Sequence, residues 1–287
     1  MIIVRIWEGL GNQMFQYAYA MSLREKGIDV RIDLDKSYDS MFGKYRGNEI
    51  RENSIQNFKI SISSINMKCY KKYEYLYRDT WKKKVIFWLQ NHLLWKYKFY
   101  EEEEPGFSKK VAELKGNYYI KGWFQNEEYF KNIRSIILKE FLPKKKIKIS
   151  KELKKALQDQ ESVSMHIRRG DFLRIGLVLN ATYYEKAIDY VKNIYRNPII
   201  LIFSDDLEWV KKNIHLSGKY IFVNEKRKLK DYEELFIMSR CKANIISNST
   251  FSWWGAWLNQ NQDKIVVAPR KWNNGQENIV PEDWITL

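Results

Sequence analysis

Short apolar segments that suit β-strands alternate with helical segments through much of the chain, and this alternation constrains the fold more than any other feature. The expected strands are residues 2–6, 28–34, 163–167, 199–203, 220–223, 243–247 and 265–268. The expected helices are residues 13–26, 183–194, 207–213, 231–239 and 252–258. Strands that alternate with helices form mainly parallel sheets covered on both faces, so the sequence predicts an α/β protein.

The pattern divides near the middle of the chain. Pro143 is followed by KKKIK (residues 144–148), and such a run of like charges cannot pack in a core. We therefore expect a first domain over residues 1–143 and a second over residues 144–287. A chain of 287 residues is long enough for two domains of this size.

Composition sets the expected location. The sequence contains no run of eighteen or more uncharged apolar residues, and its N-terminus lacks the basic leader and long apolar run of a secretory signal. Cys69 and Cys241 lie far apart without a CxxC spacing, which argues against a disulfide framework or a zinc cage. We expect a protein of the cytoplasm.

The formal net charge of +15 would attract nucleic acid, anionic lipid or a small anionic substrate. Most of the excess is lysine spread along the chain, and no zinc-finger, RNP or basic-zipper motif accompanies it. Sequence-specific binding of nucleic acid is therefore not expected.

One segment departs from the alternation. In TWKKKVIFWLQNHLLWKYKF (residues 80–99), three tryptophans fall on one helical face and lysines gather at both ends: Trp81, Trp88 and Trp95. This helix either caps the core of the first domain or lies on an anionic membrane with its aromatic side down.

The stretch SMHIRRGD (residues 164–171) carries the strongest chemical signal, because Arg168 and Arg169 directly follow a predicted buried strand. Loops at the carboxyl ends of parallel strands are where open α/β sheets bind ligands. Two guanidinium forks match the oxygens of a diphosphate. In the alternative interpretation the arginines form structural ion pairs with Asp171 or with an acid of a nearby helix.

The stretch IISNSTFSWW leads from another predicted strand into a helix at the same expected sheet edge. Its polar residues, Asn248, Ser249 and Thr250, offer donors to a phosphate, or they cap the helix. Asp205 and Asp206 end a third strand there. They could bind Mg²⁺, accept hydrogen bonds from guanine or cap the next helix, and the arginines already supply the charge that a metal would bring.

A loop with two glycines, Gly9 and Gly11, lies between the first strand and the first helix. The third glycine of a dinucleotide fingerprint is missing, because Met14 stands in its place. Asn12 and Gln13 in this loop could cap the helix or contact a sugar.

Together these motifs resemble the alpha-1,2-fucosyltransferases of glycosyltransferase family 11, over nearly the whole chain and in the expected order. The resemblance rests on GLGNQMFQYAYA (residues 9–20), HIRRGDF (166–172), FSDD (203–206) and SNSTFSWWGAWL (247–258), and more weakly on GWFQNEEYF (122–130) and KIVVAPRKW (264–272).

The resemblance implies a GT-B-like fold of two facing Rossmann-type domains, with the donor held mainly by the second domain and the acceptor glycan towards the first. It implies an inverting transfer of L-fucose from GDP-beta-L-fucose to the 2-hydroxyl of a terminal galactoside. The reaction would need no metal and no cofactor besides the donor substrate.

The resemblance also implies roles for single residues. Arg168 and Arg169 would hold the diphosphate. The residues expected to bind the donor are Asn12, Gln13, His166, Asp205, Asn248, Ser249 and Thr250. Asp171 is the first candidate for the base that deprotonates the acceptor, unless it only fixes an arginine, and Glu8 is the second. Glu8 stands where the family often has a further glycine.

The leading hypothesis is thus a cytoplasmic galactoside alpha-1,2-fucosyltransferase for a surface glycan or its lipid-linked precursor, with peripheral contact at the anionic inner face of the membrane. One alternative is a transferase with another GDP-sugar donor or another linkage. Another is a non-catalytic basic module that binds glycan or nucleic acid, against which the clustering of the motifs at one sheet edge argues.

Overall fold

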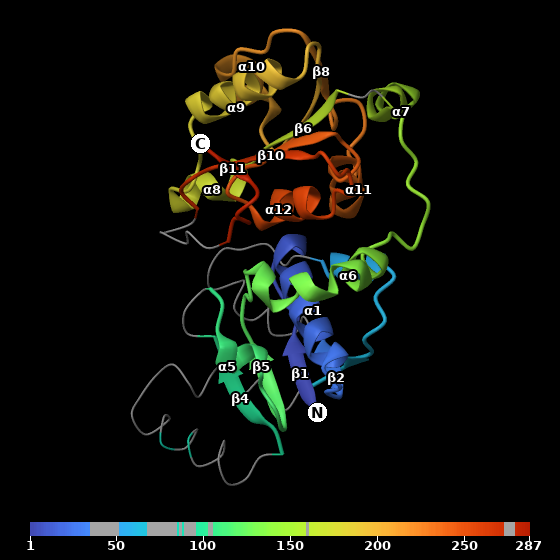
Figure 1. Ribbon diagram of the computed structural model, residues 1–287, viewed down its shortest axis with the longest axis vertical. Helices are drawn as coiled ribbons and strands as arrows, with labels where there is room; N and C mark the ends of the chain where they lie inside the picture. Colours follow the sequence, from blue (N-terminus) through green and yellow to red (C-terminus); the bar gives the residue numbers. More distant parts are fainter. Residues whose placement is uncertain are drawn as a thin grey trace. The chain divides into compact units, whose positions relative to one another are not determined.

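The computed structural model describes residues 1–34, 52–67, 85, 88, 96–102, 106–158, 161–272 and 279–287. The chain divides into two compact units, Met1–Leu142 and Pro143–Leu287, which are the first and second unit below (Figure 1). The division falls next to the run of lysines at residues 144–148.

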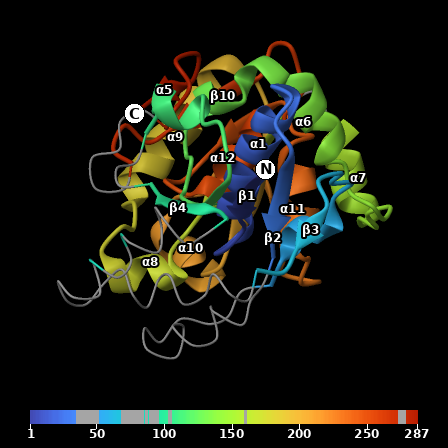
Figure 2. The same cartoon turned by 90° about the horizontal axis from the view of Figure 1, so that it is seen from below.

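The described part of the first unit contains a five-stranded sheet in the order β3-β2-β1-β5-β4, in which every pairing is parallel. Strands β3, β2 and β1 follow one another across this sheet (Figure 2). Its strands are β1 (Ile2–Arg5), β2 (Val30–Asp33), β3 (Ser64–Ile65), β4 (Lys98–Glu101) and β5 (Tyr118–Lys121). Its α-helices are α1 (Leu10–Glu25), α5 (Lys109–Ala112) and α6 (Arg134–Glu140), and its 3-10 helices are η1 (Ser54–Asn57), η4 (Glu127–Tyr129) and η5 (Lys131–Ile133).

Helix α1 is the central helix of the first unit. It follows β1 directly, starts after Gly9, and is buried along nearly its whole length rather than on one stripe. A helix that is buried on all sides has neighbours on all sides, and its buried polar residues, which include Gln13 and Gln16, need hydrogen-bond partners there. The aromatic ring of Tyr19 stacks on Phe124 at 4.0 Å between centroids, and Phe15 meets Phe130 at 5.9 Å. Helix α1 thus joins the sheet to the segment that follows β5.

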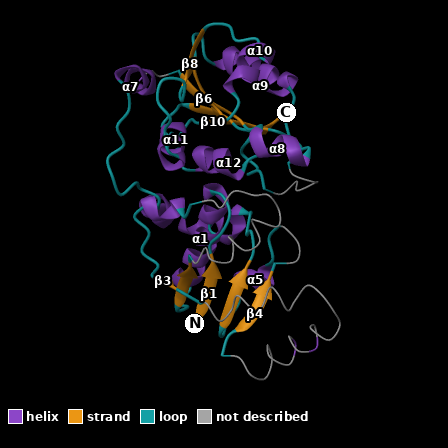
Figure 3. Cartoon of the chain, turned by 180° about the vertical axis from the view of Figure 1, so that it is seen from behind, coloured by secondary structure: helices purple, strands orange, loops and turns teal. Residues whose placement is uncertain are grey.

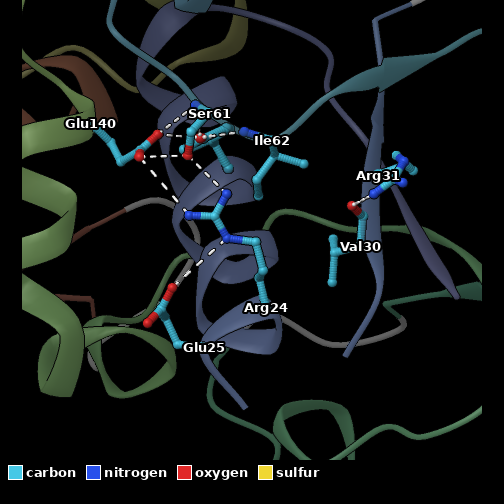
Figure 4. Close-up of polar contacts among 8 residues, drawn as sticks. Arg24, Glu25, Val30, Arg31, Ser61, Ile62 and Glu140 are labelled. Atoms are coloured by element: carbon cyan, nitrogen blue, oxygen red, sulfur yellow. Dashed lines mark hydrogen bonds and ion pairs between the residues drawn. The ribbon is translucent and has the colours of Figure 1, made fainter. Parts of the chain in front are cut away.

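A polar network fastens the end of the first unit to α1 (Figure 4). The Tyr17 hydroxyl donates to Glu140 Oε2 at 2.5 Å, and the Ser61 hydroxyl donates to Glu140 Oε1 at 2.6 Å. Arg24 Nη1 donates to the Ser61 hydroxyl at 2.8 Å. The backbone N–H of Ser61 also donates to Glu140 Oε2, at 2.7 Å. One carboxylate therefore links α6, α1 and the segment between η1 and β3.

The described part of the second unit contains a six-stranded sheet in the order β11-β10-β9-β6-β7-β8, again with parallel pairing throughout. Helices lie around this sheet (Figure 3). The strands are β6 (Ser162–Ile167), β7 (Ile199–Ser204), β8 (Lys219–Phe222), β9 (Ala243–Ile245), β10 (Ile265–Ala268) and β11 (Ile285–Thr286). The helices are α7 (Lys151–Gln158), α8 (Gly170–Ile175), α9 (Ala181–Ile194), α10 (Leu207–Asn213), α11 (Asp231–Met238) and α12 (Thr250–Trp257).

The central strands of this sheet are buried on both faces. Along β7, Ile200 and Ile202 join the cluster that includes Val191 of α9, whereas Leu201 and Phe203 join the cluster that includes Ile237 of α11. This alternation follows from the two-residue period of a strand, and apolar side chains at both parities require helices on both faces.

The predicted α/β class with mainly parallel sheets is confirmed in both units. Strands β3, β4, β5 and β11 and helices α5 to α8 were not predicted. The predicted helix over residues 81–95 lies outside the described residues except for Val85 and Trp88, which are helical and 49% and 55% exposed. Within the described residues, no helix is both long and apolar enough to span a bilayer.

Candidate active site

The strand order of the second unit reverses between β6 and β9. From β6 the chain proceeds to β7 and β8 on one side, and then to β9, β10 and β11 on the other. The crevice beyond the carboxyl ends of the strands at such a switch point is the usual ligand site of a doubly wound sheet. Residues 168–171 leave β6 at this point and are here named the arginine loop, although the last two of them begin α8. Residues 246–250 leave β9, and Thr250 begins α12.

The strand register brings the arginine loop next to the end of β7. Ile167 pairs with Ser204, so the residues that follow them, Arg168 and Asp205, become neighbours. Arg168 Nη1 lies 2.9 Å from Asp205 Oδ2, and its Nη2 lies 2.8 Å from Asp171 Oδ1. The structural ion pairs considered from the sequence are therefore present at Arg168. They fix its guanidinium group between two carboxylates.

Arg169 is held differently. Its guanidinium carbon lies 3.8 Å from the centroid of the Trp209 ring, and its Nε donates to Asp206 Oδ2 at 3.1 Å. The side chain is 12% exposed. Within the described part of the chain, its two Nη groups have no hydrogen-bond or ion-pair partner. Stacking and the Nε bond thus orient a guanidinium fork whose bidentate side is left for a ligand.

Asp206 connects this fork to a helix. Its Oδ1 accepts the backbone N–H of Trp209 at 3.1 Å, which caps the start of α10, while its Oδ2 accepts from Arg169. Helix capping was one of the predictions for this acid pair. Asp205 accepts the backbone N–H of Arg169 at 2.9 Å besides pairing with Arg168. Both aspartates therefore position the arginine loop.

Gly170 allows the loop to approach Asp205 closely. A Cβ atom built at this position would lie 2.8 Å from Asp205 Oδ2, closer than such contacts occur. Any side chain at residue 170 would push against the carboxylate that holds Arg168. The glycine of the RRGD sequence is thus explained by packing.

His166 is buried near the end of β6. Its Nδ1 lies 3.0 Å from the Ser247 hydroxyl, and its ring centroid lies 5.4 Å from that of Phe251. Burial, with a smaller contribution from the Arg168 charge, lowers the pKa of His166 to about 3. The imidazole is therefore neutral at physiological pH and links β6 to the loop after β9 by a neutral hydrogen bond.

Three predicted donor ligands lie in that loop or at the helix after it. Ser249 is buried at the N-cap position of α12, but its side chain makes no capping hydrogen bond. Thr250 is the first residue of α12, and Asn248 Nδ2 donates to the Leu177 carbonyl at 2.8 Å. The hydroxyl of Ser249 is thus not used for capping, whereas Asn248 joins the loop to the end of α8.

Sequence analysis missed two residues beside these groups. Trp209 is the platform for Arg169. Glu234 of α11 accepts from Asn224 Nδ2 at 2.5 Å and interacts electrostatically with Arg168 and Asp205. Burial raises the pKa of Glu234 to about 7, and the Asn224 hydrogen bond acts in the opposite direction. A carboxyl group that changes charge near neutral pH therefore adjoins the arginine loop.

Three predicted site residues lie in the first unit, namely Glu8, Asn12 and Gln13. Gln13 is 1% exposed; its Nε2 donates to the carbonyls of Glu8 at 2.7 Å and Glu52 at 2.8 Å, and its Oε1 accepts the N–H of Ile55 at 3.0 Å. This buried side chain joins three backbone segments, and its predicted contact with the donor stays a prediction. Asn12 Oδ1 accepts from Gln125 Nε2 at 2.8 Å.

Glu8 adopts a φ of +66°, a backbone conformation that glycine favours. This observation fits the sequence expectation that glycine often occupies this position in the resembled family. The glutamate side chain is kept at a conformational cost of about 1–2 kcal/mol relative to an unstrained residue.

No group of three or more His, Cys, Asp or Glu side chains in the described part of the chain is arranged to hold a metal ion. The paired acids after β7 are bonded to the arginine loop and to α10, as described above.

Comparison with known proteins places the chain among glycosyltransferases. It is similar to an O-antigen biosynthesis glycosyltransferase, WbnK, of Escherichia coli, with 32% identity over 97% of this chain and 98% of that protein. It is also similar to an alpha-1,2-colitosyltransferase of Escherichia coli, with 32% identity over 100% of this chain and 98% of that protein. A galactoside alpha-(1,2)-fucosyltransferase 1 of Sus scrofa is 32% identical over 33% of this chain and 28% of that protein.

The family model described as glycosyl transferase family 11 matches residues 1–286. The resemblance noted from the sequence motifs is thereby confirmed over the whole chain. The protein is a member of glycosyl transferase family 11.

Proposed function

We propose that this glycosyltransferase moves L-fucose from GDP-beta-L-fucose to the 2-hydroxyl of a terminal galactoside with inversion at the sugar carbon. The observation that carries the proposal is the oriented fork of Arg169. A nearly buried guanidinium group whose Nη atoms lack partners within the described chain is a site for a bidentate anion. A nucleoside diphosphate is the anion that suits a switch-point crevice.

The chemistry needs this charge at the leaving group. Cleavage of the bond between fucose and GDP leaves negative charge on the diphosphate and positive charge on the sugar. Guanidinium groups fixed before the reaction stabilise the departing diphosphate without reorganising. We propose that Arg169 replaces the metal ion that other transferases use there, assisted by Arg168, which Asp171 and Asp205 hold beside it, and that GDP-fucose is needed without a cofactor.

The remaining second-unit residues would complete the donor site. Ser249 and Thr250 lie at the start of α12, where backbone N–H groups and hydroxyls favour a phosphate. His166 is neutral and would contribute a hydrogen bond rather than charge. Asp205 is committed to Arg168 and to the loop backbone, so we assign it to holding the loop in addition to any contact with guanine.

The identity of the proton acceptor is open to a direct test. Asp171 is paired with Arg168 at 2.8 Å, which supports a positioning role. Glu8 belongs to the first unit, which we propose binds the acceptor. We therefore propose Glu8 as the base. Both Glu8→Gln and Glu8→Gly should lower kcat. Unchanged kcat in both variants would make Asp171 the proposed base instead.

The names of the relatives support two donors. The galactoside alpha-(1,2)-fucosyltransferase 1 match supports fucose. The alpha-1,2-colitosyltransferase match extends over 100% of this chain and supports colitose, which is fucose without its 3-hydroxyl. A GDP-colitose-dependent transferase is thus the second candidate, with the same linkage and the same diphosphate site.

The test is calorimetric titration with GDP and with GDP-fucose in EDTA, followed by product analysis with lactose as acceptor. Saturable binding and an alpha-1,2-fucosylated product are expected. GDP-colitose and GDP-mannose in competition separate the candidate donors. Absence of GDP binding at any concentration up to 1 mM, about −4 kcal/mol, would reject a nucleotide-sugar site altogether.

We further propose that the enzyme works in the cytoplasm, on a glycan or its lipid-linked precursor at the inner face of the membrane. The net charge of +15 supports peripheral contact with anionic lipid. Co-sedimentation with vesicles of anionic against zwitterionic lipid tests this location, and equal binding to both would contradict it.

A further inference from the structure

The first unit has a switch point of its own. Its chain proceeds from β1 to β2 and β3 on one side of the sheet, whereas β5 and β4 lie on the other side. The reversal therefore falls between β1 and β5. By the rule that applies to the second unit, the loops that leave these two strands are a place for a ligand.

Two tryptophans meet at this point. Val4 pairs with Ile120, and continuing that register by three residues puts Trp7 opposite Trp123. Their ring centroids are 4.4 Å apart with an interplanar angle of 40°. Both side chains are partly buried rather than packed in the core. The strand register thus creates an aromatic pair from residues far apart in the sequence.

The backbone on both sides of the pair is strained. Glu8, next to Trp7, has a φ of +66°, and Phe124, next to Trp123, has a φ of +50°. These are the non-glycine residues with positive φ in the described chain. Such strain is retained where surrounding contacts enforce it, and it gathers at functional sites.

The contacts that enforce the strain are specific. Phe124 is fully buried and stacks on Tyr19. Glu102 accepts the backbone N–H of Trp123 at 2.5 Å and that of Phe124 at 3.0 Å. A Cβ atom at residue 122 would lie 2.5 Å from the Phe124 ring, so only glycine fits there. Contacts of the neighbouring residues with the core of the first unit therefore fix the backbone position of Trp123.

Polar groups adjoin the aromatic pair. The indole N–H of Trp7 is buried without a hydrogen-bond acceptor in the described part of the chain, which is uncommon for this donor. Gln125, in the loop after β5, donates from its Nε2 to Oδ1 of Asn12, in the first turn of α1, at 2.8 Å. Both residues are partly exposed. Aromatic faces beside amide groups are the surfaces that bind a ring with one apolar face and a rim of hydroxyls.

Resting on the function proposed above, we infer that Trp7 and Trp123 form the acceptor subsite. The Trp123 indole covers the C–H face of a terminal galactose ring, Trp7 packs against Trp123 with the Lys121 ammonium group 4.9 Å from its ring centroid, and Asn12 and Gln125 contact the sugar hydroxyls. A galactopyranose has such a face, because its axial 4-hydroxyl leaves the C–H groups at positions 3, 4 and 5 together on the other side. This inference assigns Asn12 to the acceptor subsite, whereas the sequence motifs assigned it to the donor site.

The first test uses the unaltered protein. Indole nitrogens are labelled with ¹⁵N, the signals of Trp7 and Trp123 are identified with the variants Trp7→Phe and Trp123→Phe, and lactose is titrated in the presence of GDP. Saturable shifts of these two signals are expected. If both stay unchanged while GDP shifts other signals, the subsite is wrong.

The second test is kinetic. Trp123→Ala should raise the KM for lactose about tenfold, as loss of an aromatic stacking partner does, with a change of less than about twofold in the KM for GDP-fucose. Phe107→Ala is the matched control, because Phe107 is an exposed aromatic residue of the same unit that packs on Tyr129. An unchanged lactose KM in Trp123→Ala would overturn the inference, whereas absence of GDP binding in the unaltered protein would instead overturn the proposed function.

Discussion

Each unit has a switch point in a parallel sheet, but the two switch points carry opposite chemistry. In the second unit, the loops after β6 and β7 hold two arginines among three aspartates. In the first unit, the loops after β1 and β5 hold two tryptophans beside amide groups. Equivalent positions, beyond the carboxyl ends of the central parallel strands, thus present charge at one site and aromatic groups at the other. What a parallel sheet binds is decided by the few residues that follow its central strands.

The two sites also differ in what fixes them. Side chains hold the arginine loop in place, through ion pairs and the Trp209 platform. Core packing and strained backbone hold the tryptophan loops. The first arrangement is sensitive to charge and pH, and the second to side-chain volume. The predictions below use this difference.

The largest effect is expected from Arg169→Ala. Removing the fork should lower kcat by about 10²–10³-fold, as loss of one preorganised donor does, and weaken GDP binding, while lactose-induced indole shifts persist. Steady-state kinetics and calorimetry measure these quantities. Arg174→Ala is the control, because Arg174 is an exposed residue of the adjacent helix α8. Full activity of Arg169→Ala would show that the charged site is not the diphosphate site.

Glu140→Ala should destabilise the first unit alone. The variant leaves the Tyr17 and Ser61 hydroxyls without their acceptor, at a cost of about 2 kcal/mol in the free energy of unfolding. Amide hydrogen exchange followed by mass spectrometry should show faster exchange in α1 and unchanged exchange in β6. Glu128→Ala, which removes an exposed pair with Lys131, should have little effect. Equal loss of protection in both units would mean that they unfold together.

Glu234→Gln should change the pH dependence of stability. The folded-state pKa of Glu234 is raised to about 7, so its contribution to stability is present below its unfolded-state pKa of about 4.5 and is lost as the pH rises towards 7. His166, with a pKa lowered to about 3, has the opposite effect, because stability is lost as the pH falls from about 6.5 towards 3.

In the unaltered protein these two contributions offset each other between about pH 4.5 and 6.5. Without Glu234, stability should rise with pH more steeply, by about 1 kcal/mol per pH unit in this range. Urea denaturation at four pH values measures the slope. Glu208→Gln is the control, since the side chain of Glu208 is 89% exposed. If the free energy of unfolding changes with pH in Glu234→Gln as it does in the unaltered protein, the Glu234 carboxyl group is exposed to solvent.

The smallest expected effect is the coupling energy between Arg169 and Trp123, which should be close to zero. Arg169→Lys keeps the charge without the fork, and Trp123→Phe keeps an aromatic ring. Because the two residues are proposed to bind different substrates, their effects on kcat/KM should add within about 0.5 kcal/mol in the double variant. A larger coupling energy would mean that the arginine and tryptophan sites act on the same substrate.

The sequence predicted the arginine site because its signals are local. His166, Arg168 and Asp171 stand within six residues at the end of one strand, and the strand pattern alone puts Asp205 at the same edge. Trp209 was missed because a tryptophan in the first turn of a helix has the same sequence signature as a core residue. Glu234 was missed because an acid in an acidic first turn is ordinarily solvated.

The tryptophan site depends on long-range pairing, which no local pattern encodes. Trp7 and Trp123 become neighbours only because β5 pairs with β1, and β5 itself was not predicted. Gln13 is a second example, because its hydrogen-bond partners also come from distant parts of the sequence. Its loop position suggested a sugar contact, but its hydrogen bonds go to segments around Glu52 and Ile55 that only the fold brings near.

The shared carboxylate of Asp206 has a practical consequence. Because one oxygen caps α10 at the Trp209 N–H and the other holds Arg169, fraying of that first helical turn and loss of arginine orientation are one event. The exchange rate of a single backbone amide therefore reports how often the arginine is out of position. Slower exchange of that amide on adding nucleotide would give a label-free measure of donor occupancy, usable even for acceptors whose product is unknown.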